Sequence, residues 1–114
     1  MEDAYKIIYE YLLTCGCTPK LSGFKYLIDA INICLDIEYV NSFEKDIYFV
    51  ISQKYEKNLG AVKKAIKNAI DTAALNYNLN DETCVFNMAS SIKSGSIPSA
   101  EFIAYSAQKI KYNP

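Results

Sequence analysis

Apolar residues recur every three or four positions along most of this 114-residue chain, and no segment alternates convincingly between apolar and polar residues. A period near 3.6 residues is that of an α-helix with one buried face, whereas a half-buried strand needs a period of two. The chain also has only four glycines and three prolines, too few for a turn-rich β fold. The pattern therefore predicts an all-α protein, and its length is typical of one domain.

The apolar stripes predict five or six helices separated by short polar, glycine or proline segments. We expect helices over about 3–14, 23–38, 43–55, 59–76, 83–90 and 98–111, the fifth being the most weakly specified. Ser22, Ser42 and Asn58 are the candidate N-caps of the second, third and fourth helices. Together these segments predict one compact domain with short connections.

Each expected helix carries one apolar stripe that we assign to the core. Small side chains at Ser52 and Ala65 also predict a close crossing of the third and fourth helices. The core candidates, helix by helix, are Tyr5, Ile8, Tyr9 and Leu12; Phe24, Leu27, Ile28, Ile31, Cys34 and Leu35; Phe43, Ile47, Val50 and Ile51; Val62, Ala65, Ile66, Ala69, Ile70 and Ala73; and Phe102, Ile103, Tyr105, Ala107 and Ile110.

Charge is distributed unevenly along the chain, although the formal net charge is only −1. Residues 1–51 hold four lysines and eight acidic residues, for a net charge of −4. Residues 52–70 hold five lysines and one glutamate, for a net charge of +4, and the chain has no arginine. The whole molecule thus has no basic field of the kind that binds nucleic acid in bulk, but one short segment is strongly cationic.

Several kinds of chemistry lack the residues they need. The chain has no histidine, the commonest general acid or base, and its isolated glycines form no phosphate-binding loop. Cys15, Cys17, Cys34 and Cys84 do not have zinc-site spacing, and we expect them to be small buried side chains. The acidic N-terminus is unlike a signal peptide, and no apolar run is long enough to cross a membrane. These features predict a cytoplasmic protein that is not an enzyme and uses no metal or cofactor.

The fourth expected helix has two contrasting faces. Opposite its apolar stripe lie Lys63, Lys64, Lys67, Asn68 and Asp71, and only residues 56–58 separate it from the third helix. Two helices joined by a tight turn, the second with a cationic outer face, describe a helix-turn-helix over about residues 43–76. Such a unit reads DNA by laying its second helix in the major groove. A helix pair with a merely solvated face fits the same pattern equally well.

Three segments resemble a known family. They are "LSGFKYLIDAI" (21–31), "QKYEKNLGAVKKAIKNAID" (53–71) and "PSAEFIAYSAQKIK" (98–111). Over residues 5–112 the chain resembles the C-terminal effector domain of the stage zero sporulation protein A family, response regulators that start sporulation. The resemblance implies six helices, a helix-turn-helix formed by the third and fourth of them, and a recognition helix over Asn58–Ala74. It also implies binding to short DNA boxes as tandem dimers and contact with the sigma subunit of RNA polymerase.

The recognition helix departs from that family's pattern. The family has arginine at the positions of Ala61, Lys64 and Lys67, glutamate at Lys63 and histidine at Asn68. Lysine keeps the positive charge of arginine but lacks the planar fork that binds guanine through two hydrogen bonds. The 114 residues leave no room for a phosphoacceptor receiver domain, so we expect a single effector domain unless the chain is a fragment.

Two functions are consistent with the sequence. The first is a sequence-specific DNA-binding regulator of transcription, in which base-facing Lys64, Lys67, Asn68 and Ala61 contact guanine, adenine and the thymine methyl group. The phosphate-facing candidates are Lys54, Lys57, Lys63 and Asn58. The second function is a diverged protein-interaction module that modulates a full-length regulator or RNA polymerase without reading DNA.

Overall fold

The computed structural model describes residues 2–76 and 97–112, and every regular element within these two ranges is helical. The five α-helices are α1 (Glu2–Thr14), α2 (Ser22–Asp36), α3 (Phe49–Tyr55), α4 (Leu59–Asn76) and α5 (Ser99–Tyr112). The all-α fold is thus confirmed, with helix boundaries close to those expected from periodicity. The helix expected over 83–90 lies outside the described residues.

The third expected helix contains an irregular first part. A π-helical turn, η1 (Glu44–Tyr48), runs directly into α3, and the backbone N–H of Phe49 donates to the carbonyl of Glu44. Ser42 caps this segment, because its Oγ accepts a hydrogen bond from the Lys45 N–H at 3.2 Å. Asp46 completes the cap by accepting hydrogen bonds from the N–H groups of Asn41 and Ser42. The predicted cap at Ser42 is therefore confirmed.

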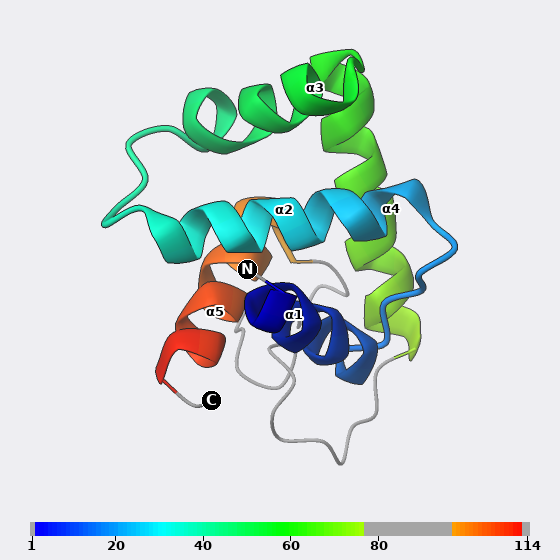
Figure 1. Cartoon of the computed structure of the whole chain (residues 1–114). Helices are drawn as coiled ribbons and strands as arrows, with labels where there is room; N and C mark the ends of the chain where they lie inside the picture. Colours follow the sequence, from blue (N-terminus) through cyan, green and yellow to red (C-terminus); the bar gives the residue numbers. More distant parts are fainter. Residues whose placement is uncertain (1, 77–96, 113–114) are drawn as a thin grey trace.

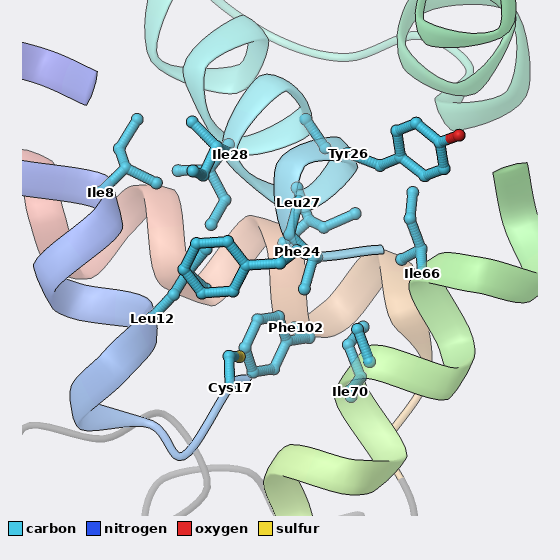
Figure 2. Close-up of a cluster of buried hydrophobic side chains, with 14 of the residues drawn as sticks. Ile8, Leu12, Cys17, Phe24, Tyr26, Leu27, Ile28, Ile66, Ile70 and Phe102 are labelled. Carbon is cyan, nitrogen blue, oxygen red and sulfur yellow. The ribbon is translucent and has the colours of Figure 1, made fainter. Parts of the chain in front are cut away.

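Helix α2 lies at the centre of the molecule. It packs chiefly against α4 and α5 and also contacts α1, η1 and α3. In Figure 1, α3 lies on one side of α2, and α1 and α5 lie on the other. Figure 2 shows Phe24 and Leu27 of α2 among side chains contributed by α1, α4 and α5. These contacts make α2 the helix against which the others are positioned.

The core matches the predicted stripes at most positions. Fully buried side chains come from all five α-helices and η1, as expected for stripes that converge on one core. The predicted core residues that are buried are Ile8, Leu12, Phe24, Leu27, Ile28, Ile31, Ile47, Ile51, Val62, Ile66, Ala69, Ile70, Ala73, Phe102, Ile103 and Ala107. Cys15 and Cys17 are also buried as predicted, Cys34 is half-buried, and Cys84 lies outside the described residues.

Three predicted core positions are wrong. The side chains of Tyr5, Val50 and Tyr105 are 55%, 46% and 37% exposed. Val50 faces outward because the buried residues of η1 and α3 are Ile47, Tyr48, Ile51 and Ser52, a face that points away from Val50. Tyr5 instead stacks on Tyr9, with ring centroids 6.4 Å apart. The predicted cap at Ser22 is also wrong, because α2 begins one residue earlier than expected and Leu21 takes the cap position without a side-chain hydrogen bond.

Helices α2 and α4 approach each other closely at Gly23. A Cβ atom placed on Gly23 would overlap the Ala65 carbonyl group and would lie only 2.9 Å from the Ala69 Cβ. The sequence predicts a close crossing at Ala65 but assigns it to Ser52 of the third helix. The structure places Ala65 against Gly23 of α2, and this contact fixes the position of α4 on the central helix.

Candidate nucleic-acid interface

The segment between α3 and α4 is a tight turn of three residues, 56–58. Glu56 adopts the left-handed conformation, with φ 53° and ψ 46°, and caps the end of α3. The N–H groups of Glu56 and Lys57 donate to the carbonyls of Gln53 and Ser52, at 3.3 and 2.9 Å. A left-handed residue of this kind commonly ends a helix and reverses the chain direction sharply. As a result α4 leaves the end of α3 at a steep angle (Figure 1).

Asn58 starts α4 as its N-cap, which confirms the prediction. Its side-chain Oδ1 accepts hydrogen bonds from the N–H groups of Gly60 and Ala61, at 2.8 and 3.3 Å. Its own carbonyl accepts the first helical hydrogen bond, from the Val62 N–H at 3.0 Å. Because the Asn58 side-chain oxygen is occupied by this cap, only its amide group is left to reach a phosphate.

The two faces of α4 are separated as the sequence predicts. The buried face consists of Val62, Ile66, Ala69, Ile70 and Ala73. Among the candidate base-facing residues, Ala61, Lys64 and Asn68 are exposed and Lys67 is half-buried. Of the candidate phosphate-facing residues, Lys54, Lys57, Asn58 and Lys63 are all exposed.

Helix geometry places these residues on different parts of the outer surface. At about 100° per residue, Lys64 lies almost opposite the centre of the buried face. Ala61 and Asn68 lie to one side of Lys64, whereas Lys63 and Lys67 lie to the other side, toward the flank that carries the ion pairs. A groove that received α4 would therefore meet Lys64 first, with Ala61 and Asn68 beside it.

Carboxylates pair with three of the five lysines in residues 54–67. The Lys63 Nζ lies 2.9 Å from the Glu44 Oε1, and the Lys67 Nζ lies 3.1 Å from the Asp71 Oδ1. The Lys54 Nζ lies 3.1 Å from the Asp29 Oδ1. The hydrogen bond and charge of Lys63 hold the pKa of Glu44 below its usual value. For Lys57 and Lys64, the described part of the chain supplies no carboxylate within ion-pair distance.

Sequence reasoning missed Asp29 and Glu44 as neighbours of the cationic segment. The Lys67–Asp71 pair is separated by four residues on one helix and is visible in the sequence. The other two pairs join residues 25 and 19 positions apart, so no local pattern indicates them. Only the packing of α2 and η1 beside the helix pair brings these carboxylates to the lysines.

A separate groove of about 300 Å³ lies away from α4. It is formed by the end of α2, the segment after it and α5, and Cys34, Tyr39, Phe43 and Lys111 are among its lining residues. Burial raises the pKa of the Cys34 thiol to about 11, so this thiol stays protonated at neutral pH. None of the candidate DNA-contacting residues lines this groove.

Residues 2–76 and 97–112 contain neither a cluster of metal ligands nor a membrane-spanning helix. In these ranges no three His, Cys, Asp or Glu side chains come together as a metal site would require. No helix there combines the length and the apolar character needed to span a membrane.

Comparison with known families agrees with the resemblance carried by the three quoted segments. The family model described as "Sporulation initiation factor Spo0A C terminal" matches residues 8–110 of the 114-residue chain. That match spans every described helix in whole or in part, including the complete turn between α3 and α4. No solved structure matches the chain.

Proposed function

Because this chain belongs to the family of the sporulation initiation factor Spo0A C-terminal domain, we propose that it is a sequence-specific DNA-binding regulator of transcription. The family is one of DNA-binding effector domains of sporulation regulators and is not an enzyme class. The finer proposal is that α4 enters the major groove and reads base edges there. The observation that carries it is the exposed, lysine-bearing face of α4, which begins directly after the tight turn at residues 56–58.

In this proposal α4, the turn before it and the end of α3 make two kinds of contact with DNA. Lys64, Lys67, Asn68 and Ala61 face the bases, where ammonium groups bind guanine acceptors and an amide pairs with adenine. Lys54, Lys57, Lys63 and Asn58 face the phosphates and set the position of the helix on the duplex. Lys64 has the central role, because it is exposed and lies almost opposite the buried face.

Charge reversal at the centre of this face tests the proposal. We expect the wild-type chain to bind duplex DNA at low salt and the Lys64→Glu/Lys67→Glu variant to lose at least about tenfold in affinity. The measurement is fluorescence anisotropy with a family-type duplex and a random duplex, and circular dichroism confirms that each variant is folded. Lys6→Glu/Lys111→Glu is the matched control, because these exposed lysines lie on α1 and α5.

The salt dependence of the DNA affinity tests the same interface independently. Three to five lysine–phosphate contacts predict a slope of log affinity against log salt of about −3 to −5 for the wild-type chain. Absence of binding at low salt, or equal binding by the charge-reversed variant, would refute DNA recognition by α4. Equal affinity for the two duplexes would refute sequence specificity alone.

A second candidate function is favoured by the ion pairs of the cationic segment. Three of its lysines are paired with carboxylates, which lowers the positive potential available to DNA. In this second proposal the chain modulates a full-length regulator or RNA polymerase through protein contacts. Size-exclusion chromatography with purified sigma subunit and with a full-length regulator tests it. Co-elution without DNA binding would favour this function, and specific DNA binding without co-elution would exclude it.

A further inference from the structure

The carboxylate of Asp29, on the central helix α2, holds the last two residues of α3. The Tyr55 hydroxyl donates a hydrogen bond to the Asp29 Oδ2 at 2.6 Å. The Lys54 ammonium donates to both oxygens of the same carboxylate, at 3.1 and 3.2 Å. The Asp29 side chain is only 18% exposed. A short hydrogen bond from a hydroxyl to a partly buried carboxylate is among the stronger hydrogen bonds that proteins form.

The ring of Tyr55 is held by two further groups from α2. It meets the Tyr26 ring edge-on, with centroids 5.1 Å apart and planes inclined at 61°. The Lys25 Nζ lies 4.9 Å from the centroid of the Tyr55 ring. Tyr26 is buried, so the ring against which Tyr55 packs belongs to the core. Tyr55 therefore contacts α2 through a hydrogen bond, an aromatic pair and a cation–π contact.

These contacts affect the start of α4 because of the place of Tyr55 in the chain. Tyr55 is the last residue of α3, and the left-handed turn at Glu56 follows it directly. Three residues later α4 begins, with its cap at Asn58 and with Ala61 and Lys64 in its first two turns. A change in the position of Tyr55 would thus shift the start of α4 relative to α2.

We propose that Asp29 is a positioning residue for DNA recognition, which fixes the start of α4 by accepting the hydrogen bond of Tyr55. The inference rests on the proposed DNA-binding function and extends it to a residue outside the helix pair. The hydrogen bond from Tyr55 needs only an acceptor oxygen, whereas the contact of Lys54 with both carboxylate oxygens depends on the charge of Asp29. The two roles can therefore be separated by substitution.

Three variants distinguish the acceptor from the charge. Tyr55→Phe keeps the ring and removes the hydroxyl, Asp29→Ala removes both contacts, and Asp29→Asn keeps an oxygen acceptor without the charge. We expect Tyr55→Phe and Asp29→Ala to weaken binding to a family-type duplex by at least about five-fold, and Asp29→Asn to bind at least as tightly as wild type. Tyr39→Phe is the matched control, because Tyr39 is 71% exposed and lies beyond the C-terminal end of α2.

Two readouts separate positioning from a purely structural effect. Anisotropy is measured at a temperature where circular dichroism shows every variant fully folded, so lower stability alone leaves the affinity unchanged. In Tyr55→Phe, affinity for a random duplex and the salt slope should also stay at wild-type values, because this substitution changes no charge and removes no phosphate contact. In the free protein, hydrogen exchange of the Gly60, Ala61 and Val62 amides should be about tenfold faster in Tyr55→Phe than in wild type.

The possible failures are distinguishable. If wild type binds the duplex and Tyr55→Phe and Asp29→Ala bind it equally well, the positioning role of Asp29 is wrong and the proposed function stands. If Asp29→Asn loses as much affinity as Asp29→Ala, the charge is what matters and the acceptor role is wrong. If wild type binds no duplex, the proposed function and this inference both fail.

Discussion

Lys63 of α4 already has an ion-pair partner in the free protein. Its ammonium lies 2.9 Å from the Glu44 Oε1, and both side chains are about half exposed. An exposed pair of this kind is weak, because water and salt screen it, and a phosphate offers a carboxylate-like alternative. In the proposed function, a phosphate therefore replaces Glu44 as the partner of Lys63. Glu44 then competes with DNA for this lysine.

Removal of the Glu44 charge should strengthen DNA binding. We expect Glu44→Gln to raise duplex affinity by about two- to five-fold at low salt, because Lys63 no longer has to leave a carboxylate. The gain should shrink at high salt and should disappear in a Lys63→Gln background. Salt-titrated anisotropy measures all three effects. Glu38→Gln is the matched control, since Glu38 is exposed and lies after the end of α2. An equal gain in the control, or no gain in Glu44→Gln, would contradict direct competition.

At the scale of the helices, the sequence predicts the elements better than it predicts their contacts. The stripe from Val62 to Ala73 identifies the buried face of α4 correctly, because that face is a local property of one helix. The partner of that face is not local. Gly23 of α2 meets Ala65 and Ala69, residues more than 40 positions away in the sequence, and the small size of a glycine does not say what lies opposite. The sequence alone therefore does not identify the helix that packs against this face of α4.

A methyl group at Gly23 should disrupt this crossing. A Cβ atom there would meet the backbone carbonyl of Ala65, which cannot move without shifting α4. We expect Gly23→Ala to lower the free energy of unfolding by about 1–3 kcal/mol, although alanine is the better helix former. Chemical denaturation followed by circular dichroism measures the change.

The control for this substitution is Gly60→Ala in the first turn of α4. A Cβ atom at Gly60 would lie 3.1 Å from the Asn58 Oδ1, which belongs to a side chain that can move. We therefore expect a change of less than about 1 kcal/mol in either direction. Equal effects of the two substitutions would mean that the α2–α4 crossing is not tightly packed at Gly23.

At the scale of the whole molecule, the candidate site is only partly contained in the cationic segment. The sequence indicates Lys54, Lys57, Lys63, Lys64 and Lys67 through their concentration in an acidic chain. The carboxylates that pair with Lys54 and Lys63 come from α2 and η1, which only the assembled fold brings close. The charge available to a ligand therefore depends on tertiary packing as well as on composition.

The same assembled fold buries groups that ionise at alkaline pH. Burial raises the pKa of Cys34 from 9.0 to about 11. Burial, and then the charge of Cys34, raise the pKa of Tyr48 from 10.0 to about 12. Burial and the hydrogen bond to Asp29 raise the pKa of Tyr55 as well. All three groups are neutral at pH 7, so the folded state is at its full stability there with respect to them.

Stability should be lost on the alkaline side as a consequence. In the unfolded chain these groups lose their protons near their ordinary pKa values of 9.0 and 10.0, before the folded chain does. Above about pH 9 the unfolded state therefore binds fewer protons, and the free energy of unfolding falls with rising pH until the folded groups also ionise.

We expect the melting temperature, followed by circular dichroism, to be level from pH 7 to 8.5 and to fall steadily from about pH 9 to 11.5. Cys34→Ala should make the fall between about pH 9 and 10 shallower, because one thiol that ionises on unfolding is removed. A melting temperature that stayed constant through pH 11, or a fall that Cys34→Ala left unchanged, would show that the burial of these groups does not govern stability at alkaline pH.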